Sequence, residues 1–177
     1  PLGNLVLAYG RAPKPGSSDS FDFSDTEYPY RRISSLLDPH ASLTHPVRFL
    51  ERISAKAHEL GTPRQKRFLV RLCRALASVI EPDERSARSR GCPPALCPSQ
   101  WATRGFAFAP AWARLRAWER RVACVVIDLA RHAYDAFPRC ESPFDQSAVL
   151  LLDRPDRYCP GRRVDRFLTA LDALLSR

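Results

Sequence analysis

Residues 110–137, PAWARLRAWERRVACVVIDLARHAYDAF, decide the fold of this chain. They form its longest run without glycine or an internal proline, which predicts one helix of about seven turns. Between Val122 and Ala130 the only charged residue is Asp128, so this segment is apolar on nearly every face. A helix that is apolar all round is covered by other elements. We therefore predict an all-α fold, a single bundle of five to six helices around this central helix.

The length and composition are those of one globular domain. A chain of 177 residues can bury about two thirds of its unfolded surface, and a hydrophobic fraction of 45% is typical of such proteins. No apolar run approaches the roughly 18 residues that cross a bilayer, so we expect no membrane contact. Residues 1–3, Pro-Leu-Gly, resemble the remnant of a cleaved tag and are left out of the functional interpretation.

Five further segments carry helical patterns on either side of the central helix. The one before Gly61 starts with Thr44 as its expected N-cap and Pro46 in its first turn. The next opens directly with Thr62-Pro63, so the two should form an antiparallel hairpin. The predicted helices are residues 31–37, 46–60, 63–81, 144–152 and 162–177. Residues 82–109 form a long irregular loop, and residues 31–177 together form the domain.

Residues 1–30 are expected to form an arm, with a short strand or docked peptide at residues 4–9. Residues 18–30, SDSFDFSDTEYPY, alternate carboxylates with aromatic side chains. The arm carries two positive and four negative charges, which leaves +11 on the remainder of a chain whose net charge is +9. Such segments dock into basic, hydrophobic grooves. The expected groove lies on this domain or on a partner, and the expected contact residues are Phe21, Asp22, Phe23, Asp25 and Tyr28.

The sequence offers no complete set of residues for catalysis or metal binding. Cys92 and Cys97 have a spacing that zinc sites use, but no second close Cys/His pair accompanies them. No nucleophile elbow and no Gly-rich phosphate loop is present. We therefore expect no enzyme activity, no cofactor and no structural metal, with Cys92 and Cys97 as the weak metal candidates. The irregular spacing of the six cysteines favours a reducing, intracellular compartment.

Arginine and tryptophan residues suggest nucleic-acid binding as an alternative. The chain has 28 basic residues, of which only Lys14, Lys56 and Lys66 are lysines. Arginine pairs with phosphate, and exposed aromatic rings stack on single-stranded bases. A GC-rich coding sequence would enrich arginine equally well. The candidate residues are Arg85, Arg88, Arg90, Trp101, Arg104, Arg116, Arg120 and Arg121.

Two short motifs resemble known docking helices. Leu69, Cys73 and Ala77 match the Leu-x3-Cys-x3-Ala core of the elongin-binding box of ubiquitin-ligase substrate receptors. That resemblance implies an adaptor that binds elongin C through residues 63–81, although Phe68 departs from the family pattern. Residues 171–175, LDALL, resemble the LxxLL box that docks on nuclear receptors. An apolar stripe that faces the core would produce the same residues at the same spacing in both motifs.

These observations favour a non-enzymatic protein-interaction module. We expect it to belong to an intracellular, nuclear regulatory protein, and to use helix grooves and the acidic-aromatic arm to bind a protein partner. Direct RNA or DNA binding and elongin binding are the alternatives. The sequence leaves the oligomeric state open.

The central helix provides the first testable prediction. Val126→Asp places an unpaired carboxylate on its most apolar turn, at a cost of several kcal/mol. This cost is comparable with the whole stability of a domain. We expect the variant to lose its cooperative thermal transition in circular dichroism. An unchanged melting temperature would remove this helix from the core.

Overall fold

The described part of the chain is mostly helical. The computed structural model describes residues 5–10, 14–15, 42–43, 45–59, 62–80, 112–113 and 115–175. Within these ranges the α-helices are α2 (Pro46–Glu59), α3 (Pro63–Ile80), α7 (Ala117–Ala136) and α8 (Val164–Leu175). An all-α description is therefore broadly right, but a bundle of five to six helices is not confirmed. The predicted helix 31–37 and loop 82–109 lie outside the described residues.

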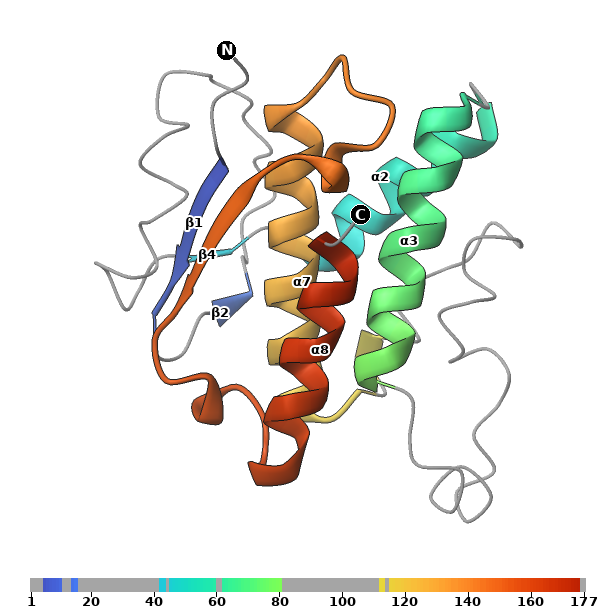
Figure 1. Cartoon of the computed structure of the whole chain (residues 1–177). Coiled ribbons are helices and arrows are strands. Elements are labelled where there is room, and N and C mark those ends of the chain that lie inside the picture. Colours follow the sequence, from blue (N-terminus) through green and yellow to red (C-terminus); the bar gives the residue numbers. More distant parts are fainter. Residues whose placement is uncertain are drawn as a thin grey trace.

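Helix α7 is the centre of the structure, as predicted (Figure 1). Residues 122–130 are at most 4% exposed. Helices α2 and α3 contact it, as do three of the four short strands that the structure describes, and the strands lie on its other side. The helix begins at Ala117 and not at residue 110, because the backbone N–H of Arg116 donates to Glu119 Oε2 at 2.7 Å. This is the arrangement of a helix N-terminus, in which an early carboxylate closes the first turn.

Helices α2 and α3 form the predicted hairpin. Thr62 Oγ1 accepts the N–H of Gln65 at 3.4 Å and donates to Gln65 Oε1 at 2.8 Å, which caps α3 as the Thr62-Pro63 pair predicted. In α2 the side chain that caps the first turn belongs to His45, whose Nδ1 accepts the N–H of Arg48 at 3.4 Å. The expected cap, Thr44, lies outside the described residues. The buried faces of both helices include the predicted residues Val47, Leu50, Ile53, Phe68, Leu69, Leu72, Cys73, Leu76, Val79 and Ile80.

The prediction of a helix over residues 144–152 is wrong. This segment contains a 3-10 turn, η3 (Pro143–Asp145), followed by strand β4 (Ala148–Leu152). Strand β4 pairs in parallel with β1 (Leu5–Tyr9), in a register that runs from Leu5 opposite Ala148 to Tyr9 opposite Leu152. Val149 and Leu151 are 47% and 50% exposed, whereas their neighbours are half-buried, so the exposure has the period of two that a strand gives.

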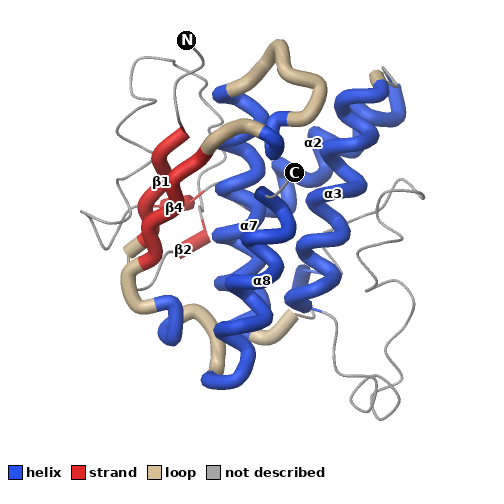
Figure 2. Tube along the Cα trace, viewed as in Figure 1, coloured by secondary structure: helices blue, strands red, loops and turns tan. Residues whose placement is uncertain are grey.

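Two very short strands form a second parallel pair. Strand β2 (Lys14–Pro15) lies beside β3 (Ser42–Leu43), and both contact α7. Together with β1 and β4 they lie on one side of α7, while α3 lies on the other (Figure 2). The expected arm therefore belongs in part to the domain, since β1 is a core strand. Residues 18–30 lie outside the described residues.

A buried hydrogen bond ties β1 to α7. The hydroxyl of Tyr9 donates to Asp128 Oδ2 at 3.0 Å, and His132 Nε2 lies 3.4 Å from the same oxygen. All three residues are at most 4% exposed. Burial raises the pKa of Tyr9 well above its ordinary value, and the charge of Asp128 raises it further. The phenol therefore stays protonated and keeps its role as a donor.

Arg64 from the start of α3 binds backbone carbonyls at the C-terminal end of α7. Its Nε donates to the carbonyl oxygen of Cys140 at 2.7 Å, and its Nη2 donates to those of Tyr134 at 3.1 Å and Phe137 at 3.0 Å. The last carbonyls of a helix have no partner within the helix. One guanidinium from the start of α3 thus closes the C-terminal end of α7.

Helix α8 packs its apolar face on α3. It follows two 3-10 turns, η4 (Pro155–Arg157) and η5 (Gly161–Arg163). Phe167, Leu171 and Leu174 are buried as predicted, but Leu168 is 39% exposed and lies off the buried face. None of the described helices combines the length and the hydrophobicity that crossing a membrane would require.

The Tyr9 contact can be tested by removing one oxygen. Tyr9→Phe leaves the ring in place and deprives the buried carboxylate of Asp128 of a donor. Losing a partner of a buried polar group costs about 1–3 kcal/mol. We expect that loss in the free energy of unfolding measured by urea titration. A double-mutant cycle with Asp128→Asn is the control, since two sites that do not interact would give additive effects.

Candidate functional site: a cationic groove on α3

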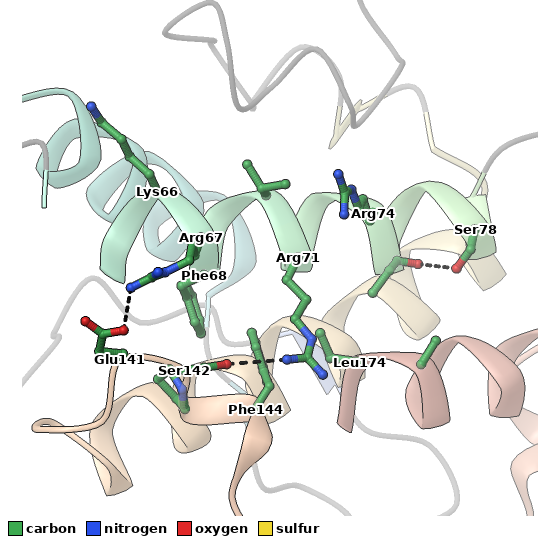
Figure 3. Close-up of a pocket in the computed structure, with 14 residues that line it drawn as sticks. Lys66, Arg67, Phe68, Arg71, Arg74, Ser78, Glu141, Ser142, Phe144 and Leu174 are labelled. Atoms are coloured by element: carbon green, nitrogen blue, oxygen red, sulfur yellow. Dashed lines mark hydrogen bonds and ion pairs between the residues drawn. The ribbon is translucent and has the colours of Figure 1, made fainter. Parts of the chain in front are cut away.

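A groove of about 770 Å³ lies along α3, against residues 141–144 and the C-terminal half of α8 (Figure 3). We call it the α3 groove. Its volume is in the range of binding pockets, roughly 300–1,000 Å³. The described residues that line it are Lys66, Arg67, Phe68, Val70, Arg71, Arg74, Ala75, Ser78, Glu141, Ser142, Pro143, Phe144, Ala173 and Leu174.

The floor of the groove is apolar and rigid. The rings of Phe68 and Phe144 stack in parallel, with centroids 4.8 Å apart and an angle of 6° between their planes. Phe68, Phe144 and Leu174 are each at most 2% exposed, so they are fixed by the core behind them. Val70 is 38% exposed and adds apolar surface that the chain does not itself cover.

Four cations from α3 surround this floor. Residues three and four apart lie on the same side of a helix, which groups Arg67, Arg71 and Arg74, and Lys66 directly precedes Arg67. The opposite side of α3 is the buried stripe that packs on α7. The amphipathic pattern that builds the core therefore also gathers these four cations on one outer surface.

Two of the four cations fasten residues 141–145 to α3. Arg67 Nη2 lies 2.8 Å from Glu141 Oε2, with side chains 57% and 83% exposed. An exposed pair of this kind contributes about 0.2–1 kcal/mol. Arg71 pairs with Asp145, donates to Ser142 Oγ at 3.4 Å and lies over the ring of Phe144, 5.6 Å from its centroid. Arg71 is therefore the stronger link and positions the wall of the groove.

The other two cations face solvent. Lys66 and Arg74 are exposed and point away from the wall in Figure 3, on either side of Val70. Within the described residues, neither of them forms an ion pair with an Asp or Glu. The order along this edge is cation, apolar side chain, cation. Such an edge suits a ligand that presents carboxylates around an apolar group.

The described lining of the groove holds no histidine or cysteine. Ser78 Oγ donates to the carbonyl oxygen of Ala75 at 2.8 Å, and Ser142 Oγ accepts from Arg71. Across the described ranges, no three His, Cys, Asp or Glu side chains come together as metal ligands. The metal candidates Cys92 and Cys97 lie outside the described residues.

The predicted arginine-rich face is described only at one end of α7. Arg116, Arg120 and Arg121 are exposed there. Trp118 nearby is partly buried against the core, and the guanidinium of Arg163 lies over its ring at 4.4 Å from the centroid. One face of this indole is therefore used within the chain. The remaining candidates, Arg85, Arg88, Arg90, Trp101 and Arg104, lie outside the described residues, as do Phe21, Asp22, Phe23, Asp25 and Tyr28.

The residues of the two short motifs pack inside the domain. Leu69 and Cys73 of the elongin-type motif are 2% and 1% exposed. Leu171 and Leu174 of the LxxLL-type motif are 3% and 1% exposed. A docking helix must present these side chains to its partner, and here they are taken up by the chain's own core. Their burial favours the interpretation of both motifs as core stripes.

The α3 groove was not among the sites predicted from sequence. The signal available was the segment PRQKRFLVRLCRAL, residues 63–76, in which basic residues recur on the side of the helix opposite to the apolar stripe. This pattern is also typical of a solvated helix surface. The wall at residues 141–144 comes from a distant part of the chain, and only the tertiary structure shows that it lies against α3.

Comparison of the chain with protein-family models, curated protein sequences and solved structures finds no match. The interpretation of the groove therefore depends on its own residues.

The buried thiols yield a prediction about reactivity. Burial raises the pKa of Cys73 to about 12 and that of Cys124 to about 12. At pH 8 only about one such thiol in ten thousand is a thiolate, the form that reacts. Iodoacetamide at pH 8 should therefore leave both residues unmodified in the native protein, as measured by peptide mass spectrometry. Both should react fully in 6–8 M urea (roughly the range that unfolds such domains), and rapid native labelling would contradict their burial.

Proposed function

We propose that this protein is a non-enzymatic interaction module that binds a segment of a protein partner in the α3 groove. The observation that carries the proposal is a row of exposed side chains beside a rigid aromatic floor. Along α3 this row consists of Lys66, Val70 and Arg74. The ligand is a peptide that combines carboxylates with aromatic or other large apolar side chains. The wider expectation of an intracellular, nuclear regulatory protein is part of this proposal. The free thiols of the described cysteines support the intracellular part.

The spacing of the two cations sets the length of the ligand. Lys66 and Arg74 are eight residues apart, which is about 12 Å along a helix that rises about 1.5 Å per residue. An extended peptide covers this span in about four residues, at roughly 3.3 Å each. The minimal ligand is therefore a stretch of about five residues with carboxylates near its ends.

The two parts of the groove contribute differently to binding. Burying Val70 and the ligand's aromatic side chains supplies affinity at about 25 cal/mol per Å² of apolar surface. Lys66 and Arg74 are solvated, so their pairing with carboxylates contributes mainly to association rate and to selectivity for acidic ligands. Binding should then weaken moderately with salt, without the steep dependence that phosphate contacts produce.

Nucleic-acid binding is the alternative function. Its described support is the group Arg116, Arg120 and Arg121 at the start of α7. The α3 groove favours a peptide over a nucleic acid, because its floor is a pair of buried stacked rings. These rings are fixed by the core and are not free platforms for bases.

A charge reversal in the groove tests the proposed function. The probe is a peptide library displayed on phage and selected on the full chain, which should enrich Asp or Glu together with Phe, Tyr or Trp. Arg74→Glu should weaken a selected peptide at least tenfold by fluorescence anisotropy, because one carboxylate would meet a like charge. Arg121→Glu is the matched control, since it makes the same charge change on α7, and it should leave the affinity unchanged.

Two outcomes would contradict the proposal. One is a selected peptide that binds Arg74→Glu as well as the original chain. The other is tight binding of a single-stranded RNA oligonucleotide that Arg121→Glu abolishes and Arg74→Glu does not, which would support the nucleic-acid alternative.

A further inference from the structure

We propose that residues 18–30 of a second copy of this chain occupy the α3 groove. This inference rests on the proposed function, because it names the ligand of the same site. The chain then contains both the receptor and its ligand, and two copies bind each other reciprocally.

The side chains of residues 18–30 match those of the groove in their order. In an extended chain alternate residues lie on one face, so Asp19, Phe21, Phe23 and Asp25 share a face. The order on that face is carboxylate, aromatic, aromatic, carboxylate. The exposed edge of the groove presents Lys66, Val70 and Arg74 beside the aromatic floor. The two orders are complementary from end to end.

The acidic pattern of the segment is longer than the cationic pattern of the helix, and the cation side chains span the difference. Phe21 and Phe23 are two residues apart, or about 7 Å in an extended chain, which is within the length of the groove floor between Lys66 and Arg74. Asp19 and Asp25 lie about 20 Å apart in the same conformation. The cations that meet them start about 12 Å apart on the helix axis, and both have long, flexible side chains that extend this span outward.

The segment and the groove carry opposite charges. Residues 1–30 have two basic and four acidic residues, and all four acidic residues fall between Asp19 and Glu27. The rest of the chain carries a net charge of +11 against a total of +9. The α3 groove gathers four of these cations and only Glu141 and Asp145 against them. Attraction between the segment and the groove therefore adds to the side-chain match.

The reach of the chain between β2 and the segment favours the groove of a second copy over that of the same chain. Phe21 follows Pro15 of β2 by six residues, which span at most about 20 Å when fully extended. Strand β2 and helix α3 lie on different sides of α7 (Figure 1), and the groove lies along α3. Two packed layers, each roughly 10 Å thick, separate them even in a straight line. A real path must go round the helices, so the groove of a second copy is the accessible one.

Reciprocal docking gives a closed dimer. Each copy offers one segment and one groove, so the same pair of contacts is made twice across a twofold axis. After the first segment docks, the second docks within the same complex, at an effective concentration that can reach millimolar. Two modest contacts then suffice for a stable dimer.

Complementation between two variants tests this proposal. Phe21→Ala/Phe23→Ala keeps the groove and removes the aromatic groups of the segment, whereas Arg74→Glu keeps the segment and impairs the groove. Sedimentation velocity of the full chain should show a concentration-dependent dimer. Each variant alone should dimerise at least tenfold more weakly. An equimolar mixture should form a heterodimer, because one intact segment then meets one intact groove. Arg121→Glu is the control and should dimerise like the original chain.

Each other result overturns the inference. A full chain that stays monomeric at all concentrations excludes a second copy. If a free peptide of residues 18–30 then binds the Phe21→Ala/Phe23→Ala chain more tightly than the original chain, the segment occupies its own groove. If that peptide binds neither chain, the segment is not the ligand. In this last case a library-selected acidic peptide that loses affinity for Arg74→Glu would still support the proposed function, so the two failures are distinguishable.

Discussion

The burial of α7 on all sides is the constraint on which the rest of the structure depends. A helix with an apolar stripe needs one neighbour, but residues 122–130 have no solvent-facing side. Helices α2 and α3 cover part of this surface, and the strands β1, β2 and β3 cover another part. All of these elements precede α7 in the sequence, so the part of the chain before residue 81 supplies most of its cover. The buried Asp128 adds a polar requirement to this apolar one, and the hydroxyl of Tyr9 meets it.

The inner and outer sides of α3 differ in character because of the same constraint. Its inner stripe packs in the core and includes Leu69 and Cys73 of the Leu-x3-Cys-x3-Ala motif. Its outer surface retains the basic residues, and the segment that follows α7 comes back against it. The ion pair of Arg71 with Asp145 and the stacked rings of Phe68 and Phe144 fix that return. A binding surface of opposite character to the core thus arises on the same helix.

The sequence was sufficient wherever a structure is local and strongly periodic. The stripes of α3 and α8, the hairpin with α2 and the burial of residues 122–130 follow from spacing alone, apart from Leu168. The sequence was insufficient for residues 148–152, where a run of five apolar residues fits a helix or a strand equally well. Pairing with β1, which lies more than 140 residues earlier, stabilises the strand. The groove escaped prediction for a similar reason, since its wall and its cations come from segments that approach only in the folded chain.

The parallel pairing of β1 with β4 has a consequence for the order of events during synthesis. Strand β1 pairs with residues that follow it by more than 140 positions, so the ribosome must complete residues 148–152 before the pair can form. Until then β1 has no strand beside it. Contacts between such distant residues also slow folding, because a long loop must close first. The nascent chain therefore carries an unpaired apolar strand from the synthesis of residues 5–9 until residues 148–152 have been made.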